Sequence, residues 1–135
     1  MATIDYALLA EYAHVDAAGL LTVVGASFDR VRAANPGSGQ QLFVALRVLL
    51  DSSEESADFQ INVRPPSGQY AIGFTGQTVP NAEALPVDGK IAVVITVGVM
   101  VPLPEAGRYS VAVSLGDDDR RELPFIVEHV APGGV

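Results

Sequence analysis

Apolar and polar residues alternate with a period of two along most of this chain, which is the pattern of half-buried β-strands. Residues 58–64 and 69–75 alternate in this way on either side of an Arg-Pro-Pro-Ser-Gly turn signal at residues 64–68. These two runs predict a hairpin. Residues 42–50 alternate in the same way and predict a further strand.

A second hairpin is predicted near the end of the chain, where residues 108–115 and 123–127 alternate. The N-terminal third is less regular. Residues 6–13 contain good helix formers but also alternate, and we interpret them as a strand. Residues 20–31 predict another strand, with a bulge or bend near Gly25 because the alternation changes phase there.

Residues 91–101 differ from the other strands because both of their alternating faces are nearly apolar. A strand of this kind is either central in its sheet and overlaid by the chain's own loops, or part of an interface between subunits. The interface interpretation assigns the contacts to Val94 and Met100, which lie on the second face.

These runs predict about eight strands with turn signals every 8–12 residues or so, the pattern of a β-sandwich or barrel. We expect an all-β fold, a two-sheet antiparallel β-sandwich of Ig-like, C2-like or jelly-roll-like Greek-key type. It forms one domain at residues 1–130, with a C-terminal tail at residues 131–135. The long linkers at residues 33–40 and 77–89 are where a functional site would most often lie.

The composition narrows the classes of function. The 135 residues include no cysteine, which excludes disulfides, thiolate metal sites and cysteine nucleophiles and fits a cytoplasmic location. The first residues lack the basic and long apolar segments of a secretory signal, and no apolar run reaches the roughly 20 residues of a spanning helix. A net charge of −8 argues against nucleic acid as a partner, and we expect no membrane insertion.

Three consecutive aspartates, Asp117, Asp118 and Asp119, are the most direct candidate for a metal site. Calcium takes roughly 6–8 oxygen ligands, and three adjacent side chains do not all converge on one ion. A calcium site would therefore need a second acidic loop, either residues 51–58 or Asp16 with Asp88. The interpretation that we favour is a hairpin tip, because glycine and aspartate adopt turn conformations at little cost.

Other chemistry has weaker support in the sequence. His14 and His129, the two histidines, would both be needed for a zinc site, together with nearby carboxylates. Residues 25–29 lack the second glycine of a Gly-x-Ser-x-Gly nucleophile turn. We therefore expect no catalytic residues and no cofactor.

Two stretches carry a resemblance to a known family. Residues 7–9 with 21–31, and residues 107–109 with 123–127, resemble a family of small bacterial proteins of about this length that is known only as a domain of unknown function. The resemblance implies a compact β-sandwich and no activity, cofactor or catalytic residue. Its Gly107-x-Tyr109 element recurs in sandwich folds, where the glycine permits a tight entry into a strand and the tyrosine begins the inward face.

The leading hypothesis for function is a non-enzymatic β-sandwich that acts through its surface, as a self-assembling structural subunit or as an accessory module that docks on a protein partner. The alternative is a sandwich that binds a ligand or calcium through its loops at residues 51–58, 77–89 and 116–120. An enzyme with carboxylates at a loop end is the third possibility. The sequence leaves the identity of any small-molecule ligand open.

Overall fold

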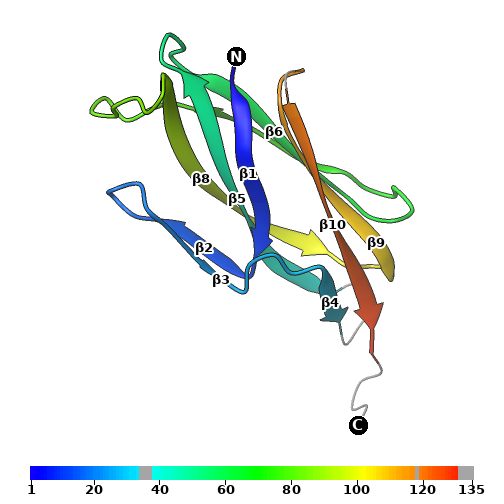
Figure 1. The fold of residues 1–135 in the computed structure, drawn as a ribbon. Helices are drawn as coiled ribbons and strands as arrows, with labels where there is room; N and C mark the ends of the chain where they lie inside the picture. The colour runs from blue at the N-terminus through cyan, green and yellow to red at the C-terminus, as the bar shows by residue number, and fades with distance from the viewer. Residues whose placement is uncertain (34–37, 118, 131–135) are drawn as a thin grey trace.

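The computed structural model of the chain describes residues 1–33, 38–117 and 119–130, so the predicted tail at residues 131–135 lies outside the described residues. The described residues form ten β-strands (Figure 1). The strands are β1 (Thr3–Ala10), β2 (Tyr12–Val15), β3 (Leu21–Val24), β4 (Arg30–Ala33), β5 (Gly39–Asp51), β6 (Ala57–Arg64), β7 (Ile72–Thr78), β8 (Lys90–Pro102), β9 (Gly107–Leu115) and β10 (Asp119–His129). In this part of the chain no helix has the length and apolar character needed to cross a membrane.

The strands form three hydrogen-bonded sheets. One sheet has the order β1-β5-β8, a second has the order β4-β10-β9-β6-β7, and β2 and β3 pair as a separate hairpin. The prediction of an all-β fold is confirmed. The prediction of about eight strands in two sheets is not, because the described residues form ten strands in three sheets.

Two breaks in the N-terminal third account for the additional strands. Glu11 interrupts the predicted strand at residues 6–13 and separates β1 from β2. The predicted strand at residues 20–31 breaks after β3, where Gly25 and Ser27 have left-handed φ angles of 61° and 62°. A Cβ on Gly25 would lie 2.6 Å from the Glu11 side chain, so the two breaks are in contact. The strand interpretation of residues 6–13 and the bend near Gly25 are both confirmed.

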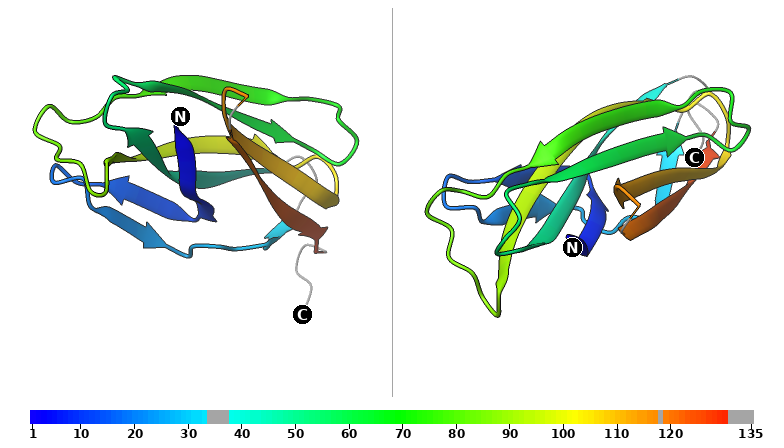
Figure 2. Two further views of the ribbon diagram at one scale, coloured as in Figure 1. Left: turned by 45° about the horizontal axis from the view of Figure 1, so that its top comes forward. Right: turned by 90° about the horizontal axis from the view of Figure 1, so that it is seen from above.

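The β2–β3 hairpin crosses the outer face of the three-stranded sheet, the face that is turned away from the five-stranded sheet (Figure 2). Ala10, Ala13 and Ala45 form a small buried cluster there, and Phe43 packs against them. The Tyr12 ring meets the Phe43 ring edge-on, with ring centroids 5.4 Å apart. The hairpin therefore gives part of the outer face a hydrophobic cover from the chain itself.

One strand pair in the five-stranded sheet is parallel. β4 runs in the same direction as the end of β10, with Arg30 opposite Ile126 and Ala33 opposite His129. The other ladders between the described strands are antiparallel. The prediction of a purely antiparallel fold is therefore corrected at this pair, because the chain reaches β10 through the bend at residues 25–29 and not through a hairpin turn.

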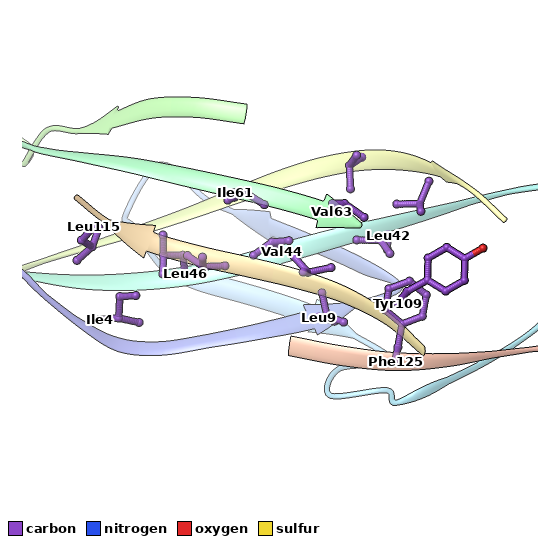
Figure 3. Packing of buried hydrophobic residues seen from close by; sticks show 14 of the residues in the cluster. Ile4, Leu9, Leu42, Val44, Leu46, Ile61, Val63, Tyr109, Leu115 and Phe125 are labelled. Atoms are coloured by element: carbon purple, nitrogen blue, oxygen red, sulfur yellow. The ribbon is translucent and has the colours of Figure 1, made fainter. Parts of the chain in front are cut away.

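The core lies between the three-stranded and five-stranded sheets, which face each other (Figure 3). Leu42, Val44 and Leu46 of β5 meet Ile61 and Val63 of β6 there, and each of the five is at most 1% exposed. Alternation places one face of each of these strands on the core, as the sequence predicts. Burial of an aliphatic side chain of this size contributes about 1.5–3 kcal/mol, so this layer is a main source of stability.

Tyr109 begins the inward face of β9, as the Gly107-x-Tyr109 element predicts. Gly107 has a φ angle of 128°, which residues with a side chain rarely adopt. The Tyr109 hydroxyl donates a hydrogen bond to the backbone oxygen of Glu105 at 2.8 Å, and its ring stacks on Phe125 with centroids 5.3 Å apart. This is the arrangement of a tyrosine corner, and it fixes the connection between β8 and β9 to the core.

β8 is an edge strand, so of the two alternatives for residues 91–101 the central position is wrong. Its neighbour in the sheet is β5, and no other described strand pairs with it. Its inner face packs on the core through residues such as Val99 and Val101. Its outer face is covered in part, since a Cβ on Gly98 would lie 2.8 Å from the Phe43 ring. The Phe43 ring of β5, on which the β2–β3 hairpin packs, thus covers part of the second apolar face.

Replacing Tyr109 by Phe removes the hydroxyl that holds Glu105 and leaves the buried ring in place. We expect the free energy of unfolding, measured by urea denaturation, to fall by about 1–2 kcal/mol because a partly buried carbonyl loses its donor. Tyr12→Phe is the matched control, since Tyr12 is 48% exposed, and it should change stability by less than about 0.5 kcal/mol. Equal effects of the two substitutions would show that the corner does not stabilise the fold.

Candidate functional site

The predicted calcium ligands at residues 117–119 lie at the turn between β9 and β10. Asp118 lies outside the described residues, and Asp117 is exposed. Asp119 is the first residue of β10, and its side chain is 20% exposed. The pairing of β9 with β10 confirms the hairpin, and Gly116 enters its turn with a φ angle of 54°. The turn interpretation accounts for Asp117, whereas Asp119 has specific partners.

Asp119 and Arg121 hold the free edge of β1. The Asp119 carboxylate accepts a hydrogen bond from the backbone N–H of Ile4 at 2.8 Å, and the Arg121 guanidinium donates one to the backbone oxygen of Ile4 at 3.0 Å. The guanidinium also donates to the Asp119 carboxylate. Two side chains of the five-stranded sheet therefore satisfy both backbone groups of a residue in the three-stranded sheet. We call Asp119 and Arg121 the β1 clamp.

The contacts of the β1 clamp favour the ionised form of Asp119. The backbone N–H of Ile4 lowers the pKa of the Asp119 carboxyl below its usual value, burial opposes this, and the Arg121 guanidinium lowers the pKa further. The carboxylate oxygens already accept hydrogen bonds from the protein. Asp119 is therefore a structural carboxylate that joins the two larger sheets.

The acidic loop at residues 51–58 is the predicted second source of calcium ligands. Asp51 accepts a hydrogen bond from the Lys90 ammonium, which lowers the pKa of Asp51 to about 2. Asp58, at the end of the loop, lines a shallow hollow together with Gly116, so the loop does reach the β9–β10 turn. Within residues 1–33, 38–117 and 119–130 there is no group of three or more His, Cys, Asp or Glu side chains that could hold a metal ion. The calcium site stays a prediction.

The two histidines lie on different sheets. His14 is exposed on β2, opposite Thr22 of β3. His129 lies at the end of β10, where its Nε2 is 3.3 Å from the backbone oxygen of Leu103. Neither belongs to a potential metal-binding group among the described residues.

The backbone of β8 turns half of its hydrogen-bonding groups away from β5. At the two ends of the β5–β8 ladder, Ser52 donates to the backbone oxygen of Gly89 at 3.0 Å, and Leu103 donates to that of Ser38 at 2.9 Å. Hydrogen-bonded and non-hydrogen-bonded pairs alternate along an antiparallel ladder, so the odd-numbered residues of β8 are the ones bonded to β5. The N–H and C=O groups of the even-numbered residues point to the open side.

Both ends of this open side are capped by the chain itself. At one end, Lys90 donates to Val87 at 3.0 Å and Val87 donates to Lys90 at 2.8 Å. At the other end, the Tyr70 hydroxyl donates to the backbone oxygen of Pro102, and Pro102 has no N–H to satisfy. Burial raises the pKa of Tyr70 to about 12, so its hydroxyl is a donor at neutral pH.

Between the caps lies an unpaired stretch that we call the open β8 edge. It consists of the even-numbered residues Ala92, Val94, Thr96, Gly98 and Met100, whose outward backbone groups meet no hydrogen-bond partner from the described part of the chain. The ladder to β5 has no bulge, and residues 91–101 carry no charge. Proteins usually protect long edge strands with charges, prolines or bulges. Here Lys90 and Pro102 protect only the ends.

The other edges of the two larger sheets are shorter or occupied. β4 has 4 residues and β7 has 7, whereas β8 has 13. β7 also contains Gly73 and Gly76, which weaken strand pairing. The free edge of β1 is held at Ile4 by the β1 clamp. Among the described strands, β8 therefore presents the long apolar edge.

A groove of about 1020 Å³ lies beside the first part of the open β8 edge. The tip of the β2–β3 hairpin and the loop after β7 line it from two sides, and Arg47 and Val94 line it from the sheet. Figures 1 and 2 show the hairpin and the loop protruding from the same side of the molecule. Leu20 on the hairpin and Val79 on the loop are 66% and 60% exposed. The predicted functional linker at residues 77–89 thus borders this groove.

The structure places Val94 and Met100, the residues assigned to an interface by the sequence, on the open β8 edge. Val94 is half-buried beside the groove, and Met100 is 59% exposed. The sequence alone does not single out Thr96 between them or the Tyr70 cap, because the pairing with β5 sets the directions of the backbone hydrogen bonds. The one available signal was Pro102, which marks where strand pairing must stop.

Comparison with known proteins gives a family but no activity. A family model described as a family of unknown function (DUF6941) matches residues 5–128. This match confirms the resemblance to a domain of unknown function, and the bacterial source stays a prediction. No curated protein matches the chain at the significance applied.

Replacing Asp119 by Asn removes the charge that holds Ile4 and Arg121 with little change in size. We expect the free energy of unfolding at neutral pH to fall by about 1.5–3 kcal/mol, the usual range for hydrogen bonds to charged groups. Asp117→Asn changes an exposed carboxylate in the same turn and should cost less than about 0.5 kcal/mol. If urea denaturation gives the same value for both variants, the β1 clamp is not a stabilising contact.

The stability difference between the wild type and Asp119→Asn should also depend on pH. The folded-state pKa of Asp119 lies below the unfolded value of about 3.9. The stabilisation is therefore complete above the unfolded value and is lost as the pH falls through the folded-state pKa. Urea denaturation at about pH 7, 5 and 3 should give equal differences at the first two values and a smaller one at the third. A difference that grows toward acid would contradict this assignment.

Proposed function

The chain belongs to this family of unknown function, and we propose that it is a non-catalytic binding module that acts through its surface. The working surface is the open β8 edge with the groove beside it, and the ligand is an extended segment of a polypeptide chain. The observation that carries the proposal is the run of unpaired backbone groups in residues 92–100 between two capped ends.

Strand addition is the binding mode that suits this surface. An extended segment that joins a sheet edge gains its affinity from main-chain hydrogen bonds, and pockets for alternate side chains give it specificity. The open β8 edge supplies the hydrogen-bonding groups. The groove lined by Arg47, Val94 and the two protruding loops is placed to receive side chains on the outer face.

The three-stranded and five-stranded sheets are the layers of a β-sandwich, and the β2–β3 hairpin is an arm on one layer. The absence of cysteine fits a cytoplasmic location. A self-assembling subunit and an accessory module on a larger partner are the two forms that such a protein would take.

A peptide with the sequence of residues 92–100, flanked by lysines for solubility, is a probe for strand addition. At low protein concentration we expect it to slow hydrogen exchange at the amides of Val94, Thr96 and Gly98, because these amides point to the open side. The amides of Ile95 and Val97 are bonded to β5 and serve as internal controls that stay protected throughout. Residue-resolved hydrogen exchange by NMR makes the measurement.

A peptide of the same length with proline at alternate positions is the matched control, since it cannot form the ladder. It should leave the exchange at Thr96 unchanged. Rapid exchange at Val94, Thr96 and Gly98 both with and without the strand-forming peptide would contradict the proposal.

A further inference from the structure

We infer that the segment that occupies the open β8 edge is β8 of a second copy of this chain, paired antiparallel about a two-fold axis at Thr96. This inference rests on the proposed function and names its partner. Three observations carry it: the register that the two caps allow, the residues that this register sets opposite each other, and the absence of charge along the strand.

The two caps lie symmetrically about Thr96. Lys90, whose outward groups are bonded to Val87, and Pro102, whose carbonyl is bonded to Tyr70, each lie six residues from Thr96. A two-fold axis at Thr96 therefore brings Lys90 of each copy opposite Pro102 of the other. The pairing would end at positions where no backbone group is left to satisfy.

The same register pairs every residue of the open β8 edge. Thr96 lies opposite its own copy, Val94 opposite Gly98, and Ala92 opposite Met100. All of these residues are even-numbered, so their backbone N–H and C=O groups point to the open side. Each pair therefore exchanges two backbone hydrogen bonds. Each pair also sets a small residue against a larger one, apart from the central Thr–Thr pair, which is favourable across strands. A shift of the axis to Ile95 or Val97 would leave outward groups of one end unpaired.

The charge pattern favours a second copy as the partner. Residues 91–101 carry no charge, although the whole chain has a net charge of −8. Two copies therefore meet along this strand without setting like charges opposite each other.

The resulting dimer has one continuous sheet with the order β1-β5-β8-β8-β5-β1. The interface is isologous, because the same patch serves on both copies. A two-fold axis within an antiparallel pair is perpendicular to the sheet, so both outer faces and both grooves lie on the same side of the dimer. The β1 edges, each held by its β1 clamp, become the outer edges of this sheet.

A charge-exchange experiment on the full chain tests the position of the axis. Thr96→Lys places two lysines opposite each other and Thr96→Glu places two glutamates there, so each variant alone should be a monomer by size-exclusion chromatography with light scattering. An equimolar mixture should recover a particle with the mass of two chains, because Lys and Glu then face each other. Wild-type chain should have the mass of a dimer.

Two further variants guard against unfolding and nonspecific charge effects. Thr75→Lys makes the same substitution on the edge strand β7 and should remain dimeric. Thr96→Pro removes an N–H that points away from β5 and so leaves the β5–β8 ladder intact. It should raise the dissociation constant of the dimer at least about 30-fold, since both copies of the Thr96 hydrogen bond are lost. Circular dichroism of each variant verifies that the β-structure is retained.

The outcomes separate this inference from the proposed function. A wild-type dimer that Thr96→Lys, Thr96→Glu and Thr96→Pro do not weaken would overturn the β8 pairing. A wild-type monomer at high concentration would also overturn it, whereas slowed exchange at Thr96 with the probe peptide would still support strand addition from another partner. Failure of both experiments would remove the proposed function as well.

Discussion

Backbone groups at the edges of a buried sheet need hydrogen-bond partners, and the two edges of the three-stranded sheet meet this need in opposite ways. At β1, the side chains of Asp119 and Arg121 bond both backbone groups of Ile4. At β8, the chain caps Lys90 and Pro102 and leaves the residues between them unpaired. One edge is thus tied to the five-stranded sheet at Ile4, and the other has a long unpaired stretch in the described part of the chain.

The contacts that stabilise the fold and the unpaired edge therefore lie in different parts of the molecule. The β1 clamp joins the two larger sheets, and the Tyr109 corner fixes the connection that follows β8, so the core is held from both ends. The same corner and the Tyr70 cap hold the end of β8 near Pro102. A rigid, preorganised edge loses little conformational entropy when a strand is added to it, which favours binding there.

Local patterns in the sequence were sufficient for much of this fold. Period-two alternation identified the strands and both hairpins, and Gly107-x-Tyr109 identified an inward tyrosine. The apolar second face of residues 91–101 pointed to Val94 and Met100. The edge position of β8, the parallel pairing of β4 and the β1 clamp depend on contacts between distant segments; Ile4 and Asp119 are 115 residues apart. For this reason the sequence suggested Asp119 as a metal ligand, whereas its contacts are those of a structural carboxylate.

Contacts between α-protons across the interface test the β8 pairing most directly. In the register centred on Thr96, Ile95 of one copy and Val97 of the other form a non-hydrogen-bonded pair, in which the α-protons lie close together. An isotope-filtered NMR experiment on a mixture of labelled and unlabelled chains would detect this contact as a nuclear Overhauser effect between molecules. We expect a signal between the α-protons of Ile95 and Val97. Intermolecular signals from another register or another surface, or none from β8, would contradict the account.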